Sequence, residues 1–191
     1  MVVDLRERLR IVKSNKADVK IENGKPTTIT KENIAKFVKG EITWAQVYGL
    51  TMQQAYAMAE IGYQLFQQGK YQDAQTVFEG LIVLNPYDSY FHSVMGSILT
   101  KTGQEDKAIR EYSISANLDP KNPQILVDRA ELLLKKGQFQ EALTDLKQAT
   151  SLDPTGKNPA VIRARGLASA TIKLLEEVLK SKQQQASAPK K

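Results

Sequence analysis

The chain has 191 residues, 41% of them hydrophobic, with no cysteine and a formal net charge of +6. This composition supports a folded core and excludes a wholly disordered chain, and the lack of thiols excludes disulfides and cysteine chemistry. No apolar run reaches the roughly 20 residues of a membrane span, and the N-terminus lacks the apolar stretch of a secretory signal. We therefore expect a cytoplasmic protein.

The charge is unevenly distributed along the chain. Residues 1–40 hold ten Lys/Arg against five Asp/Glu, residues 41–153 hold nine against fourteen, and residues 154–191 hold eight against two. Basic flanks can contact nucleic acid or anionic lipid. Because no Arg-rich run or RNA-binding motif accompanies them, we interpret the flanks as solubilising tails or as segments that fold onto the acidic block.

Residues 1–29 are predicted to be a basic, partly flexible extension. Asn23-Gly24 fits a tight hairpin within it, although a flexible polar segment fits equally well.

Residues 30–54 are predicted to be a helical N-terminal region. Thr30-x-x-Asn33 begins a short helix that stops near Gly40, a second short segment runs from Thr43 to Tyr48, and Thr51-x-x-Gln54 is a capping box. Its apolar side chains either form a homodimer surface across residues 30–50 or pack on the first repeat. They are Ile34, Phe37, Val38, Ile42, Trp44 and Val47.

Residues 55–156 contain three units with a period of 34 residues, which is typical of the tetratricopeptide helix–turn–helix repeat. Each unit has a small residue in its first helix, a turn glycine, an alanine in its second helix and a closing proline. The four series are Gly62, Gly96 and Ala130; Gly69, Gly103 and Gly137; Ala74, Ala108 and Ala142; and Pro86, Pro120 and Pro154. We predict an all-α fold of three repeats in a right-handed superhelix, with N-terminal helices and a C-terminal capping helix.

The residue types explain these series. Small residues allow the two helices of a unit to approach closely, glycine suits the left-handed conformation that ends many helices, and proline stops the next helix from continuing. Four aromatic residues of the second helices are expected in the core. They are Tyr71, Phe78, Tyr112 and Phe139.

The chain after Pro154 is predicted to form the cap. Apolar residues recur at helical spacing up to residue 180, which predicts a capping helix over residues 157–180. The last segment, SKQQQASAPKK over residues 181–191, has low complexity and is predicted to be disordered.

Candidate catalytic groups are few. The only histidine, His92, lies in a predicted helix and is interpreted as a packing residue, and no His/Cys cluster has metal-ligand spacing. The Gly-Lys pairs lack the remaining residues of a phosphate loop. We predict that the protein is not an enzyme and needs no cofactor or metal.

Residues 55–150 resemble a narrower family. The stretches Gly69-Lys70-Tyr71-x-Asp73-Ala74 and Tyr87-Asp88-Ser89-x-Phe91 are similar to the translocator (class II) chaperones of bacterial type III secretion. That family is usually acidic and has a shorter lead-in than this chain. The resemblance implies a cytosolic chaperone that binds an extended segment of a secreted translocator-type client in the concave groove and prevents its premature aggregation.

In stacked repeats the concave wall comes from the first helix of each unit, chiefly its second, fifth, ninth and twelfth positions. The predicted peptide-binding residues at these positions are Tyr56, Ala59, Tyr63, Phe66, Tyr90, Ser93, Ser97, Thr100, Val127 and Glu131. Packing of Tyr63 or Phe66 on the N-terminal helices is the alternative. A tetratricopeptide scaffold in another assembly, and a nucleic-acid-associated protein that uses its basic flanks, are the competing functions.

Overall fold

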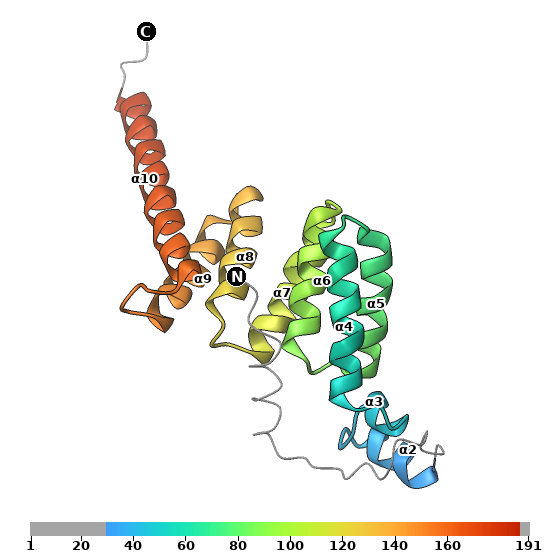
Figure 1. Ribbon diagram of the computed structural model, residues 1–191. Helices are drawn as coiled ribbons and strands as arrows, with labels where there is room; N and C mark the ends of the chain where they lie inside the picture. The colour runs from blue at the N-terminus through green and yellow to red at the C-terminus, as the bar shows by residue number, and fades with distance from the viewer. Residues whose placement is uncertain (1–29, 188–191) are drawn as a thin grey trace. The chain divides into compact units, whose positions relative to one another are not determined.

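The computed structural model describes residues 30–187, and every regular element in that range is a helix (Figure 1). Helix contacts divide the chain into two compact units, the first ending at Thr102 and the second beginning at Gly103. Unit 1 contains α2 to α6, and unit 2 contains α7 to α10. The hairpin considered at Asn23-Gly24 lies outside the described residues.

Two short helices precede the repeats, as predicted. They are α2 (Lys31–Val38) and α3 (Trp44–Val47). The Thr30 hydroxyl accepts a hydrogen bond from the Asn33 amide at 3.1 Å, and Thr43 forms a capping box with Gln46. These caps satisfy amide groups that have no partner within the helix.

The first repeat and the start of the second complete unit 1. Their helices are α4 (Met52–Gln67), α5 (Tyr71–Leu84) and α6 (Ser89–Lys101). Thr51 and Gln54 form the predicted capping box of α4. The turn glycine Gly69 has a φ of 77°, so the predicted left-handed conformation is confirmed.

Gly62 explains why α4 and α5 pack closely. A Cβ atom placed on Gly62 would lie 2.8 Å from Phe78 Cε2 and 2.8 Å from Val77 Cγ1, closer than carbon atoms approach without displacement. Ala74 of α5 is also fully buried. The predicted role of small residues at the helix contact is confirmed in this repeat.

Unit 2 begins with the remaining repeat helices. They are α7 (Glu105–Leu118), α8 (Pro123–Lys135) and α9 (Phe139–Leu152). The alanines Ala108, Ala130 and Ala142 are fully buried. Of the four aromatic residues expected in the core, Phe78 and Tyr112 are buried, whereas Tyr71 and Phe139 are half-buried near the starts of their helices.

A charged cluster ties three helices of unit 2 together. The Arg129 guanidinium of α8 donates to both carboxylate oxygens of Asp145 in α9, from Nε at 2.7 Å and from Nη2 at 2.6 Å. Its Nη1 donates to the Ser113 hydroxyl of α7 at 3.0 Å. The bidentate geometry and the burial of Asp145 make this the best-formed ion pair of the described residues.

The chain continues into the long helix α10 (Pro159–Ser187), which packs on α9 and α8. The predicted capping helix is confirmed, but its predicted end at residue 180 is wrong, because the helix includes residues 181–187. That stretch, SKQQQAS, contains three Gln, one Lys and one Ala, which are good helix formers, so low complexity here does not prevent a helix.

Candidate peptide-binding surface

The aromatic part of the predicted surface lies in unit 1. Tyr63 and Phe66 are one turn apart on α4, and both are half-buried. Their ring centroids are 5.9 Å apart, and Phe66 also lies 5.8 Å from the Tyr71 ring of α5. The rings of Tyr63, Phe66 and Tyr71 are thus in contact one after another, and each leaves part of its apolar surface exposed.

Four other predicted residues have less than a tenth of their surface exposed: Tyr56, Ala59, Tyr90 and Val127. The Tyr56 hydroxyl donates to Asp88 Oδ2 at 2.5 Å, and its ring packs against Phe91. Asp88 Oδ1 in turn accepts from the Tyr90 amide at 2.9 Å at the start of α6. Tyr56 and Asp88 therefore hold α4 against α6. The four buried residues are structural and contribute little exposed surface.

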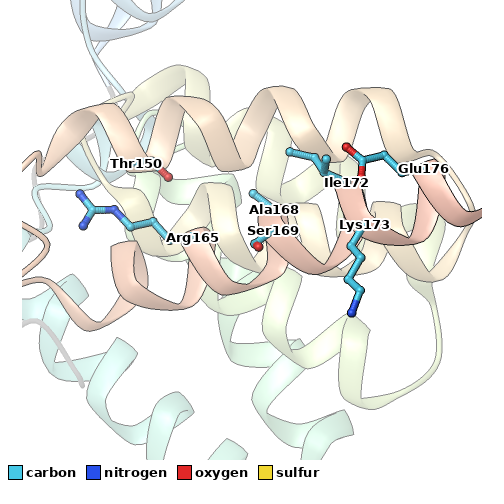
Figure 2. A pocket seen from close by; sticks show the side chains of 7 residues that line it. All are labelled: Thr150, Arg165, Ala168, Ser169, Ile172, Lys173 and Glu176. Atoms are coloured by element: carbon cyan, nitrogen blue, oxygen red, sulfur yellow. The ribbon is translucent and has the colours of Figure 1, made fainter.

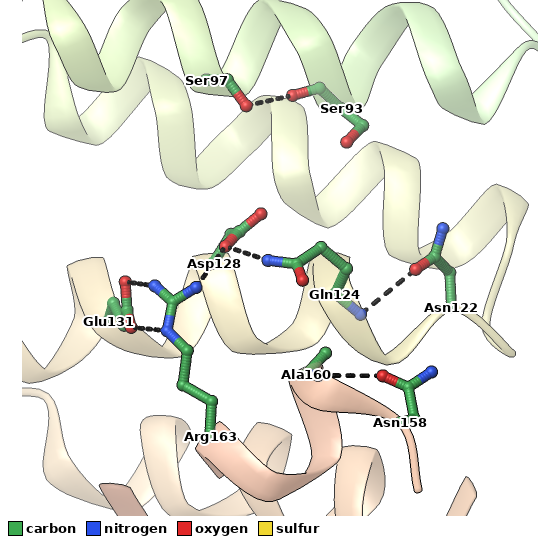
Figure 3. A network of polar contacts seen from close by, with 9 residues as sticks. All are labelled: Ser93, Ser97, Asn122, Gln124, Asp128, Glu131, Asn158, Ala160 and Arg163. Carbon is green, nitrogen blue, oxygen red and sulfur yellow. Dashed lines mark hydrogen bonds and ion pairs between the residues drawn. The ribbon is translucent and has the colours of Figure 1, made fainter. Parts of the chain in front are cut away.

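Polar residues line the predicted face of α6. Ser93, Ser97 and Thr100 are all half-buried. The Ser97 hydroxyl donates to the Ser93 carbonyl at 3.1 Å (Figure 3). The Thr100 hydroxyl donates to the Gly96 carbonyl at 2.8 Å. The short side chains of Ser97 and Thr100 therefore bond back to their own helix.

The predicted residue Glu131 belongs to a charged network in unit 2. Arg163 of α10 donates from Nε to Glu131 Oε1 at 2.6 Å, and a second contact joins the two side chains (Figure 3). Arg163 Nη1 also lies 3.8 Å from Asp128 Oδ1. The capping helix thus supplies a cation beside two acids of α8.

Asp128 is the most perturbed group of this network. Burial raises its pKa to about 6, against the hydrogen bond that Gln124 Nε2 donates to its carboxylate at 2.7 Å and the charge of Arg163, which both lower it. A carboxylate with restricted access to water holds its proton more tightly. Part of the Asp128 population is therefore protonated near neutral pH.

Sequence reasoning missed Asp128 and Arg163. Asp128 does not occupy one of the four concave positions, and the predicted surface ended with the third repeat. One signal was present: Asn158-Pro159 repeats Asn122-Pro123, and this register places Arg163 at the position of Val127. The sequence thus indicated that the wall extends onto the capping helix.

Other kinds of site find no support among residues 30–187. The lone histidine, His92, is buried with its Nε2 2.9 Å from the Pro86 carbonyl, as expected for a packing residue. Within this range no group of three His, Cys, Asp or Glu residues could hold a metal ion. None of the helices described is both long and apolar enough to cross a membrane.

The comparisons with known proteins agree with this architecture. Models of the tetratricopeptide repeat match residues 60–123 and residues 123–155. Low calcium response locus protein H of Yersinia pestis is 38% identical over 113 residues, which cover 56% of this chain and 66% of the relative. The matched region is therefore just under two thirds of that protein's length.

Solved structures place the chain in a narrower family than the tetratricopeptide repeat. The type III secretion translocator chaperone SycD of Yersinia enterocolitica is 32% identical, with a TM-score of 0.56, and the match covers 71% of this chain and 97% of SycD. The chain belongs to the translocator chaperones of type III secretion. The family suggested by the sequence is confirmed, and so is the all-α tetratricopeptide fold.

Two members of this chaperone family have been solved with bound segments of other proteins. SycD has been solved in complex with a peptide of the translocator YopD, and also as an alternative dimer. PcrH of Pseudomonas aeruginosa is 26% identical, with a TM-score of 0.60 over 65% of this chain and 96% of PcrH. It has been solved with the chaperone binding region of PopD.

Proposed function

We propose that this chaperone acts in the cytoplasm, where it binds an extended segment of a translocator-type client and keeps its apolar parts from aggregating before secretion. The observation that carries the proposal is the half-buried aromatic pair Tyr63 and Phe66 in a chain whose relatives bind translocator segments. The protein works by binding and not by catalysis.

The client contacts are assigned to the accessible part of the predicted surface. Tyr63 and Phe66 provide apolar contact area, and Ser93, Ser97 and Thr100 provide space and hydrogen-bonding groups. Sequestering an apolar segment lowers the free concentration of the aggregation-prone chain by mass action. Tyr56, Ala59, Tyr90 and Val127 support the surface from within the core.

A homodimer is proposed to form through residues 30–50. The rings of Phe37 and Trp44 lie 4.2 Å apart, and Tyr48 lies 5.8 Å from Trp44. Val38 is 77% exposed and Tyr48 48% exposed, whereas Val47 faces the interior of its own unit. We therefore assign the dimer surface to the exposed side chains Val38 and Tyr48, and packing on the chain's own first repeat to Val47.

The test is purification of the tagged full-length protein from its native cells. We expect a secreted protein with apolar segments to copurify. The double variant Tyr63→Ala with Phe66→Ala should bind that protein at least about thirtyfold more weakly, as for loss of a buried anchor. The matched control is Tyr87→Ala, because Tyr87 is 64% exposed in the loop before α6. Recovery of a folded multisubunit assembly, or equal binding by both variants, would favour a scaffold over a chaperone.

A further inference from the structure

The capping helix α10 begins as the first helix of a repeat. Asn158-Pro159 repeats Asn122-Pro123 of α8, and the two asparagines cap in the same way. Asn122 Oδ1 accepts from the Gln124 amide at 3.1 Å, and Asn158 Oδ1 accepts from the Ala160 amide at 2.9 Å (Figure 3). In this register Gly166 of α10 takes the place of Ala130.

In the part of the chain that the structure describes, α10 packs on the preceding helices α8 and α9, but no following helix packs on it as the second helix of a repeat. In α8, Leu126, Ala130 and Leu133 are buried, but their counterparts are exposed. These counterparts are Ile162, Gly166 and Ser169. A Cβ atom on Gly166 would meet nothing within 4 Å, in contrast to the close contacts at Gly62. None of the described residues fills the position that a second repeat helix would occupy.

A recess between α9 and α10 adjoins this vacant position (Figure 2). Ser169 belongs to both, and Ile172, which is 48% exposed, adds an apolar wall. The residues that line the recess are Thr150, Arg165, Ala168, Ser169, Ile172, Lys173 and Glu176. The surface left uncovered beside α10 therefore continues at Ser169 into a shallow, open recess between two helices.

Helix α10 also has apolar side chains that are exposed to solvent. Helix α10 has 29 residues against 13 in α8. In its C-terminal half Leu174 is 49% exposed and Val178 is 41% exposed. One half of α10 thus has an empty helix-binding position, and the other half has uncovered apolar side chains.

We propose that the α10 helices of two copies of this chain pair antiparallel, so that the C-terminal half of each occupies the vacant position of the other. The two helices of a repeat are antiparallel, and a two-fold axis perpendicular to α10 generates the same orientation. Such an interface is self-complementary and closed. A second copy is the occupant because one helix supplies both surfaces.

The sequence of α10 supports a two-fold axis near Ala170. Ile162, Gly166, Ala170, Leu174 and Val178 recur every four residues and form one ridge, which suits packing of i±4 ridges. The axis sets Leu174 of one copy against Gly166 of the other. A large side chain therefore meets an open position.

The charges are also complementary about this axis. Glu176 and Glu177 are the only acidic residues after Asp153 in the sequence. Antiparallel pairing brings Glu177 beside Arg163 of the other copy, where it would join the Glu131 and Asp128 carboxylates that Arg163 already contacts in its own chain. Parallel pairing in register would instead bring like charges together, which is unfavourable.

Disulfide cross-linking tests the axis directly, because the full-length chain has no native cysteine. Ala170→Cys is expected to form a disulfide dimer at least tenfold faster than Lys180→Cys under mild oxidation. Residue 180 is displaced from the axis by ten residues, so the two copies of that cysteine would lie about 30 Å apart along the helices at 1.5 Å per residue.

Sedimentation equilibrium tests the surface without cross-linking. Leu174→Glu is expected to lower the average mass at a given concentration, to half the wild-type value where α10 is the only pairing surface and from a larger assembly to a dimer where residues 30–50 also pair. Leu179→Glu is the matched control, because Leu179 is 59% exposed but lies on the opposite side of α10 from Ala170. Equal rates for the two cysteine variants, or equal masses for wild type and Leu174→Glu, would overturn the proposal. Neither readout depends on the client.

Discussion

A single missing methyl group sets the distance between α4 and α5. Gly62→Ala places a Cβ atom 2.8 Å from Phe78 and Val77, so we expect it to lower the free energy of unfolding by about 1–3 kcal/mol. Gly80→Ala is the control: it lies within α5 with nothing within 4 Å of an added Cβ, and alanine is there favoured over glycine by about 1 kcal/mol. Urea denaturation checks both values. A stable Gly62→Ala variant would show that the helices can separate at little cost.

Asp128 makes stability depend on pH. Burial raises its folded pKa to about 6 from the ordinary value of 3.8, so the folded state binds more protons than the unfolded state between these values. Stability from this group is full below about pH 4 and falls as pH rises through 6. Asp128→Asn should therefore stabilise the protein at pH 7.5 by about 1–2 kcal/mol, and much less at pH 4.5.

Chemical denaturation of Asp128→Asn and wild type at both pH values measures this effect. A difference that does not change with pH would assign the effect to packing and not to charge.

At the scale of elements, Arg129 and Asp145 bind α8 to α9 through two hydrogen bonds. Removing one partner leaves a poorly solvated charge, so we expect Arg129→Met to destabilise the protein by about 3–5 kcal/mol. The double variant Arg129→Met with Asp145→Leu removes both charges, and most of that loss should be recovered. A double-mutant cycle, with stabilities measured by thermal or urea unfolding, gives the interaction energy between the two side chains. Additive losses in the double variant would mean that the two side chains act independently.

The elements that the sequence predicted well are those with local physical causes. Thr30, Thr43 and Thr51 cap helices because their hydroxyls reach amides three residues on, and Gly69 ends a helix because only glycine adopts a φ of 77° without strain. The extent of α10 was not predicted, because its polar residues after 180 carry no apolar periodicity. The helix over residues 181–187 is indicated by the helix propensity of its residues and not by a pattern of apolar positions.

At the scale of the whole molecule, the family could be predicted but the roles of individual surface residues could not. The repeat register placed Tyr56 and Tyr63 on the same face of α4 with equal weight. The structure separates them, since Tyr56 is buried against Asp88 and Phe91 while Tyr63 is half-buried beside Phe66. Burial depends on neighbours from distant parts of the chain, which a single-helix pattern does not contain. The network of Asp128, Glu131 and Arg163 was missed for the same reason.

The resemblance of α10 to α8 bears on how such an array can change in length. Asp153 holds the loop before α10 through hydrogen bonds from the Thr155 and Asn158 amides, at 3.0 and 2.7 Å, so the incoming helix starts from a fixed point. In the register of α8, whose last residue Lys135 corresponds to Thr171, a fourth repeat would need a turn after Thr171 and a second helix that packs back on α10. Because each repeat contacts only its neighbours, a turn and helix added within α10 would extend the stack without rebuilding the repeats before it.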